Sequence, residues 1–255
     1  MSGAITIVHE PTAAEPFVVL SKPSGLASAP LSDGDASALT ECARLFPAVL
    51  KVCGKKSVEG GLLHRIDTQT GGLLLVAESQ AFYDHIIAAQ ENNAFVKGYR
   101  ADCDLDADNA AALGGFPPLD LQGKNPAALR GLELSSYFRH FGKGQKEVRP
   151  VLSDSNAAAL KKLGQKKLYS TKIVAADFLG EAVVRVQCKI AQGFRHQVRC
   201  HLAWLGLPVV GDAIYNRAFR AAGSENAAGG AMRFEAASLE FPDLFSDKIF
   251  SFSLD

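Results

Sequence analysis

The feature that most constrains this chain is the stretch from residue 60 to residue 77, which reads G-G-L-L-H-R-I-D-T-Q-T-G-G-L-L-L-V-A. The apolar run L-L-L-V-A at its end is typical of a strand that is buried on both faces. The small polar residues that follow Asp67 predict a loop just before this strand. Asp67 is the only carboxylate of the stretch, and Arg65 and His64 lie beside it. Because reactive groups usually lie on loops held by rigid elements, we expect any chemistry of the protein to be located here.

Composition and charge set broad limits on the class of protein. The 255 residues include 47% hydrophobic and 21% charged residues, which is typical of a globular protein. Its 27 basic and 27 acidic side chains give a net charge of zero, whereas nucleic-acid-binding domains are usually basic. A neutral protein can still carry a locally basic surface. The five cysteines are scattered without C-x-x-C spacing, and no apolar run approaches the length of a membrane span, so we expect a soluble cytoplasmic protein without zinc or disulfides.

Hydrophobic spacing predicts the secondary structure along the chain. Residues 1–16 are expected to form a lead-in or a first edge strand. Helical spacing of apolar residues predicts helices within residues 36–50 and 79–92, with Asp35 or Ser37 as the cap of the first. The basic, glycine-containing segment 138–150 is predicted to be a solvated loop, and a flexible basic loop of this kind could also bind the phosphates of a nucleic acid. Strands are expected at residues 17–20, 73–77, 94–101, 168–175, 182–190, 232–241 and 248–254.

The central stretch closely resembles the signature of the RluA-like pseudouridine synthases. That family reads His-Arg-Leu-Asp, two free positions, and then Thr-Ser-Gly-Leu-Leu, whereas this chain reads H-R-I-D-T-Q-T-G-G-L-L from residue 64 to residue 74. Ile66 replaces leucine and Gly71 replaces serine, and both are mild departures. The resemblance is specific because charged, small and apolar positions all have to agree.

Three further segments carry the same resemblance. Residues 22–26 read K-P-S-G-L, like the opening of the family's catalytic domain, and residues 97–99 read K-G-Y, like its Lys-x-Tyr signature. Residues 193–202 read G-F-R-H-Q-V-R-C-H-L where the family has Gly-Arg-Thr-His-Gln-Ile-Arg-Val-His-Leu. The departures are Phe194, where the family usually has arginine, and Arg195, where it has threonine. The family's later Gly-x-Pro and Gly-Asp-x-x-Tyr patterns are matched at Gly206, Pro208, Gly211, Asp212 and Tyr215.

The resemblance implies a fold and a domain organisation. The expected class is α+β, with a long mixed, mostly antiparallel, bent sheet flanked by helices and loops and a catalytic cleft between its two halves. Residues 1–16 would be an N-terminal lead-in. Residues 17–255 would form one catalytic domain with two subdomains and no separate RNA-binding appendage.

The resemblance also implies the reaction and the residues that carry it. The activity would be isomerisation of uridine to pseudouridine in ribosomal or transfer RNA, with Asp67 as the catalytic carboxylate. In the family, the tyrosine that corresponds to Tyr99 lies against the target base, and the arginine that corresponds to Arg199 pairs with this carboxylate. RNA or substrate contacts are expected from Arg65, His64, Lys97, Thr70 and Lys22.

The reaction breaks and remakes one glycosidic bond, so the chain is expected to need no cofactor and no metal and to act as a monomer on RNA. Asp67 could act as a nucleophile at the sugar carbon or as a base at the 2′ position, and the sequence leaves both roles open. A buried arginine would fix its geometry through bidentate hydrogen bonds. Because His196 and His201 do not share a helix face, we expect these two residues and Gln197 to form structural hydrogen bonds rather than a metal site.

Two other functions compete with this interpretation. The same fold could serve as a catalytically impaired RNA-binding or ribosome-assembly protein, which the neutral net charge and the Phe194 departure would favour. A carboxylate-based glycosidase is a third possibility, but most such enzymes need two opposed acids, and only Asp67 stands out here.

Overall fold

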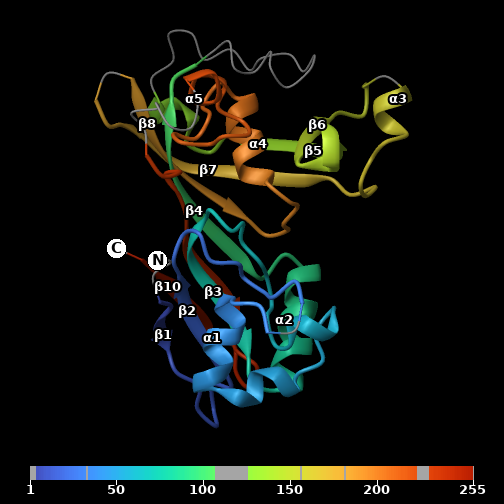
Figure 1. Ribbon diagram of the computed structural model, residues 1–255, viewed down its shortest axis with the longest axis vertical. Helices are drawn as coiled ribbons and strands as arrows, with labels where there is room; N and C mark the ends of the chain where they lie inside the picture. Colours follow the sequence, from blue (N-terminus) through green and yellow to red (C-terminus); the bar gives the residue numbers. More distant parts are fainter. Residues whose placement is uncertain are drawn as a thin grey trace. The chain divides into compact units, whose positions relative to one another are not determined.

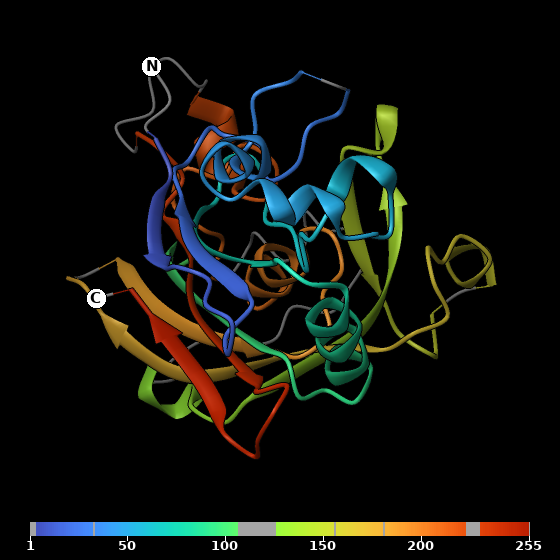
Figure 2. The ribbon, with the colours of Figure 1, turned by 90° about the horizontal axis from the view of Figure 1, so that it is seen from below.

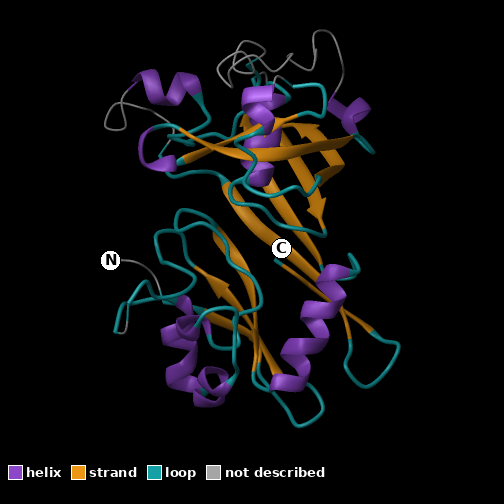
Figure 3. Cartoon of the chain, turned by 90° about the vertical axis from the view of Figure 1, so that its right-hand side faces the viewer, coloured by secondary structure: helices purple, strands orange, loops and turns teal. Residues whose placement is uncertain are grey.

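The computed structural model describes residues 4–32, 34–106, 126–155, 157–180, 182–222 and 230–254. Its strands form a ten-stranded mixed sheet accompanied by short helices, so the predicted α+β class is confirmed (Figures 1 and 3). The chain divides into two compact units, one made of Met1–Gly98 with Glu235–Asp255 and the other of Tyr99–Phe234. No helix in the described ranges is long and apolar enough to cross a membrane.

The first unit is built on strands in the order β1-β2-β3-β9, with β10 paired to β9. The strands β1, β2 and β3 are antiparallel neighbours, and β3 meets β9 in parallel (Figure 2). Residues 1–16 were predicted to be either a lead-in or a first edge strand, and β1 is that edge strand. The elements are β1 (Thr6–His9), β2 (Phe17–Lys22), α1 (Ala38–Leu45), the 3-10 helices η1 (Pro47–Lys51) and η2 (Ser57–Glu59), β3 (Gly71–Ala77), α2 (Gln80–Glu91) and β10 (Ile249–Ser253).

Serine side chains begin both helices of this unit, and Ser37 is one of the two caps that the sequence predicts for the first. Ser37 accepts a hydrogen bond from the Thr40 N–H at the start of α1, and Ser79 accepts one from the Phe82 N–H at the start of α2. Each bond satisfies a backbone donor that the helix itself leaves unpaired. The apolar face of α2 and the strand β3 then pack into one aromatic core around Phe17. Every residue of β3 after Gly71 is buried, as expected for a strand covered on both faces.

The second unit has strands in the order β8-β7-β5-β6, joined by antiparallel pairing. The chain enters this unit along β4 (Val96–Asp104) and leaves it along β9 (Phe234–Pro242). The other elements are η4 (Pro126–Leu129), β5 (Glu133–Phe141), η5 (Lys143–Gln145), β6 (Glu147–Val151), α3 (Ala157–Leu160), β7 (Tyr169–Phe178), β8 (Val183–Ile190), α4 (Gln197–Trp204) and α5 (Arg217–Ala222).

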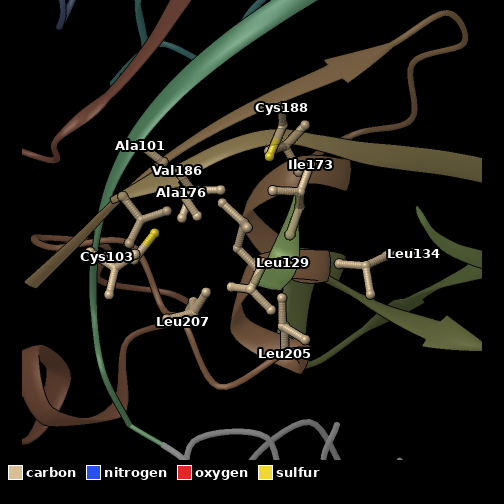
Figure 4. Packing of buried hydrophobic residues seen from close by; sticks show 14 of the residues in the cluster. Ala101, Cys103, Leu129, Leu134, Ile173, Ala176, Val186, Cys188, Leu205 and Leu207 are labelled. Atoms are coloured by element: carbon tan, nitrogen blue, oxygen red, sulfur yellow. The ribbon is translucent and has the colours of Figure 1, made fainter. Parts of the chain in front are cut away.

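One core of the second unit lies between its strands and the segment that follows α4. Figure 4 shows side chains from β4, β7 and β8, among them Cys103, Ile173 and Val186, turned toward Leu205 and Leu207. Cys103 and Cys188 are free and completely or almost completely buried in this core. They act here as small apolar groups, because burial raises the pKa of both thiols.

The segment 138–150 corrects a prediction. It is not a solvated loop, because residues on both sides of the turn form the antiparallel hairpin β5–β6, with Phe138 paired to Pro150 and His140 to Val148. Phe138 and Val148 are fully buried against α4. The buried residues alternate with charged ones, so a strand with one apolar face was concealed by its basic side chains.

A buried polar network attaches α4 to the sheet. His201 is fully buried, and its two ring nitrogens lie 2.9 Å from the hydroxyl oxygens of Ser136 on β5 and Thr171 on β7. Gln197 donates to the Ser170 carbonyl at 2.9 Å, and His196 Nδ1 lies 3.1 Å from the Tyr215 hydroxyl. The predicted structural hydrogen bonds of His196, Gln197 and His201 are therefore confirmed.

This network makes the fold sensitive to acid. Burial lowers the pKa of His201 to about 3, while an exposed histidine in the unfolded chain titrates near about 6.5. Between these values only the unfolded chain binds the proton, so stability falls as the pH falls from about 6.5 toward 3. We expect His201 to contribute about 1.4 kcal/mol per pH unit in this window, measured by urea unfolding. The His201→Gln variant should show a correspondingly smaller slope, and an unchanged slope would contradict this prediction.

The first two residues of β3, both glycines, give a matched pair for a second prediction. Gly72 has φ +115°, and a Cβ there would lie 2.2 Å from the Ala236 carbonyl oxygen of β9. Gly71 has an ordinary φ, and its nearest contact would be the Lys22 carbonyl oxygen at 3.4 Å. We therefore expect Gly72→Ala to lower the free energy of unfolding by about 2 kcal/mol or more, and Gly71→Ala to change it by less than about 1 kcal/mol. Equal losses in the two variants would show that β3 and β9 do not approach as closely as described.

Candidate active site

Asp67 lies on a loop whose backbone is hydrogen-bonded to a second loop, which contains Ser24 and Gly25. The Thr70 N–H donates to the Asp67 carbonyl at 3.0 Å and closes the turn that carries the carboxylate. The Gly25 N–H donates to the Thr68 carbonyl at 2.7 Å, and the Ser24 hydroxyl donates to the Gln69 carbonyl at 2.7 Å. These bonds fix the backbone immediately after Asp67.

A serine fixes the backbone on the other side of Asp67. The Ser28 hydroxyl donates to the Ile66 carbonyl at 2.8 Å and accepts from the Ile66 N–H at 3.1 Å. Ile66 itself is buried. The carboxylate is thus carried by a short segment whose neighbours on both sides are hydrogen-bonded to residues 24–28.

Lys22 joins the two loops from inside. Its ammonium group donates to the carbonyls of Leu26 at 2.7 Å, Pro23 at 3.0 Å and Thr68 at 3.2 Å, and the residue is only 1% exposed. Burial lowers the pKa of Lys22 to about 8, and the negative charge of Asp67 opposes this shift. The group is therefore still mainly protonated at neutral pH, with a donor for each of the three carbonyls.

This geometry gives no support to the expectation that Lys22 contacts an RNA phosphate. A buried ammonium whose three hydrogens already serve three carbonyls has none left for a ligand in solution. The sequence Lys-Pro-x-Gly indicated a turn but not the direction of the lysine side chain. The structure shows it pointing inward, where it stabilises the loop of Asp67.

His64 and Thr70 are also turned into the protein. The Leu75 N–H donates to His64 Nε2 at 3.2 Å, and this bond ties the start of the motif to β3. Burial and then the charge of Lys97 lower the pKa of His64 to about 3, so the ring is neutral. Thr70 is 1% exposed, and its hydroxyl is buried without a partner among the described residues. For His64, these contacts favour a structural role over contact with RNA.

Arg65 is the accessible basic residue of the motif. Its side chain is 58% exposed and forms an ion pair with Glu59, whose side chain is only 11% exposed, at 3.0 Å. The pair thus joins an exposed guanidinium group to a largely buried carboxylate. Glu59 was not recognised from the sequence, and no local pattern points to it.

Lys97, by contrast, is 3% exposed in β4, with its ammonium 4.3 Å from the centre of the Phe95 ring. Burial and then the positive charge of Lys55 lower the pKa of Lys97 to about 7. The Lys97 side chain is therefore not accessible from solvent in the structure described, so its burial does not favour the predicted contact with RNA.

Tyr99 and Arg199 belong to the second unit. The Tyr99 ring stacks on Phe234, with ring centres 5.2 Å apart and an interplanar angle of 8°, so a base could stack only on its other face. Arg199 is buried in α4 and donates from Nε and Nη2 to the two carboxylate oxygens of Asp212, both at 2.7 Å.

Asp212 is a positioning residue for which the sequence analysis assigned no role, although its place in the Gly-Asp-x-x-Tyr pattern was a signal. Burial alone would raise the pKa of its carboxyl group, but the hydrogen bonds and the charge of Arg199 lower it below the usual value. The N–H groups of Ile214 and Tyr215 also donate to this carboxylate. The guanidinium plane of Arg199 is consequently fixed from the side of Asp212.

The two departures from the family pattern have distinct places in the second unit. Phe194 stacks on Phe138, with ring centres 5.1 Å apart, and also contacts Tyr169. Arg195 donates to the carbonyls of Gln145 at 3.1 Å and Lys146 at 3.3 Å in the turn of the β5–β6 hairpin. Both residues therefore contact the β5–β6 hairpin and hold it in place.

In the part of the chain that is described, no group of three histidine, cysteine, aspartate or glutamate residues could hold a metal ion. The candidate site instead contains the carboxylate of Asp67, on a loop that is hydrogen-bonded on both sides of this residue, and the accessible Arg65 beside it.

Comparison with known proteins agrees with this arrangement. The chain is 26% identical over 208 residues to ribosomal large subunit pseudouridine synthase D of Zymomonas mobilis, covering 81% of this chain and 55% of that protein. It is 27% identical over 203 residues to the tRNA pseudouridine(31) synthase of Saccharomyces cerevisiae, covering 79% and 44% of the two chains. The chain thus spans about half the length of these curated relatives.

Solved structures show the same fold. Human RNA pseudouridylate synthase domain containing 1 superposes with a TM-score of 0.64 at 19% identity, covering 98% of this chain and 83% of the human one. The family model described as RNA pseudouridylate synthase matches residues 16–204, which include Asp67, Tyr99 and Arg199. The chain therefore belongs to the RNA pseudouridylate synthase family.

Proposed function

We propose that this protein converts uridine to pseudouridine within RNA and that Asp67 is its catalytic carboxylate. The observation that carries the proposal is the rigid loop of Asp67, whose backbone is hydrogen-bonded on both sides and held by the Lys22 ammonium. Catalysis at one sugar carbon needs a carboxylate in a fixed place, because reacting atoms must be aligned within about 0.5 Å. The roles that the resemblance implies for Tyr99 and Arg199 remain predictions.

The substrate class that we propose is ribosomal or transfer RNA. Support comes from the names of the relatives, which act on the large ribosomal subunit and on tRNA. The target nucleotide has to leave the base stack before its sugar carbon can be reached, at a cost of a few kcal/mol. Arg65 is exposed beside Asp67, and it is the residue of the motif best placed to contact the flipped nucleotide or its phosphate.

The first prediction concerns Asp67 itself. The Asp67→Asn variant should fold with the wild-type unfolding temperature but form no detectable pseudouridine, because an amide can act neither as the nucleophile nor as the base. The measurement is pseudouridine mapping across total RNA from a deletion strain, complemented with wild type or variant. Asp84→Asn, on the exposed face of α2, is the matched control and should restore every site. Substantial modification by Asp67→Asn would remove Asp67 from the mechanism.

A second prediction separates positioning from chemistry. In Lys22→Met, the carbonyls of Pro23, Leu26 and Thr68 lose their shared donor, so we expect the free energy of unfolding to fall by about 2–3 kcal/mol. We also expect kcat to fall at a temperature where the variant is folded, because the loop of Asp67 is less well fixed.

The matched control is Lys51→Met, which removes an exposed lysine from the same unit and should change neither quantity. A stable Lys22→Met variant with normal kcat would show that Lys22 does not position Asp67. A variant that loses stability but keeps kcat would leave the fold dependent on Lys22 and the chemistry independent of it.

A further inference from the structure

The β5–β6 hairpin of the second unit (Figure 1) carries two arginines at paired positions of its strands. Arg139 on β5 is the register partner of Arg149 on β6. Phe141 lies two residues after Arg139, and its register partner Glu147 lies two residues before Arg149. Because side chains alternate along a strand, all four lie on one face of the hairpin. The opposite face, with Phe138 and Val148, is buried in the core.

The two guanidinium groups share one aromatic ring. The Cζ atom of Arg149 lies 3.4 Å from the centre of the Phe141 ring, and that of Arg139 lies 5.0 Å from it. Contact with a ring face restricts the motion of a guanidinium group while leaving its edge donors available. Phe141 thus acts as a platform for both arginines.

The charges on this face are not balanced. Glu147 is the one carboxylate found in contact with the pair among the described residues, and it lies 3.2 Å from Arg149 Nη2. Burial and then the positive charge of Arg149 lower the pKa of Arg139, with Glu147 opposing this shift. The Nε atoms of both arginines are buried without a hydrogen-bond partner in the described ranges. One guanidinium charge is therefore in excess, in a place where water shields it poorly.

The turn of the hairpin extends the positive surface. Between residues 138 and 150 there are four basic residues and one acidic residue, a net charge of +3 in a chain whose total is zero. Lys143 and Lys146 are exposed on this turn. Arg195 holds the turn through the carbonyls of Gln145 and Lys146, so the exposed lysines are presented from an anchored backbone.

We propose that the β5–β6 hairpin binds the phosphate backbone of RNA, with Arg139 and Arg149 contacting one phosphate and Lys143 and Lys146 its neighbours. Planar guanidinium donors match the oxygens of a phosphate, and the row of lysines beyond them suits a polyanion better than a single small anion. This inference rests on the proposed function, which supplies the RNA. It gives the hairpin a role in holding substrate that is separate from the carboxylate chemistry.

The test measures how RNA binding depends on salt. Wild type, Arg139→Gln and Arg149→Gln are titrated with a labelled RNA stem-loop that has uridines in its loop, at several salt concentrations. Each lost phosphate contact should weaken binding about 3- to 10-fold at low salt and reduce the slope of log K against log salt by roughly 0.7–0.9. The control is Lys172→Gln, which removes one exposed positive charge from β7 of the same unit and should leave the slope unchanged.

Folding and small-anion binding are measured on the same proteins. Arg139→Gln relieves a like-charge contact, so its unfolding temperature should equal or exceed that of wild type. If it does not fold, Arg149→Lys keeps the charge but loses the planar donors, and weaker RNA binding by that variant supports the proposal. An unchanged RNA slope in both glutamine variants overturns the proposal. An effect of Arg139→Gln on stabilisation by inorganic phosphate, without any effect on RNA, also overturns it.

The outcome for the hairpin is distinguishable from the outcome for the proposed function. Wild-type protein that forms pseudouridine in total RNA, while the arginine variants bind like wild type, rejects only the hairpin contact. Wild-type protein that forms no pseudouridine in any RNA rejects the proposed function, whatever the salt slopes show.

Discussion

The ammonium group of Lys22 is the contact on which the candidate site depends most directly. It is buried, and it satisfies three carbonyl oxygens that would otherwise lie unpaired inside the protein. One of these carbonyls is that of Thr68, the residue that follows Asp67. A buried charge is tolerated only where several partners surround it, so the loops must keep their present paths for the lysine to remain. The same constraint that stabilises this part of the fold therefore also fixes the position of Asp67.

Rigid support of this kind recurs around Arg199 in the second unit. Asp212 is fully buried, and it accepts from two guanidinium nitrogens and two backbone N–H groups. A carboxylate held by four donors has little freedom to turn, and it orients the arginine that it binds. Arg65 differs from Lys22 and Arg199 because its side chain is exposed, although its described carboxylate partner, Glu59, is largely buried. The basic residue that we propose to contact the substrate is thus the most accessible of the three.

Much of the fold could be predicted from the sequence where one local signal dominated. Apolar residues at helical spacing marked α1 and α2, with Ser37 as one of two candidate caps for α1, and the uninterrupted apolar run marked β3 as a buried strand. The same reasoning missed β5 and β6, because their outward residues are basic and the intervening turn contains two glycines. A strand whose apolar residues face only one side gives a weak signal when its other side is strongly charged.

The sequence proposed members for the candidate site but could not indicate the directions of their side chains. The order of residues identified Asp67, Arg65 and Lys22 together, yet whether a lysine points inward depends on carbonyls that come from residues far along the chain, such as Thr68. In the same way, Phe194 counted from the sequence only as a departure that would favour a catalytically impaired protein, whereas its ring stacks on Phe138 of the hairpin. Packing of the hairpin against Phe194 and Arg195 in turn places the arginine pair on the opposite face, where both side chains are partly buried. The departure from the family pattern is therefore explained by a local exchange of an arginine for an aromatic ring that anchors a basic hairpin.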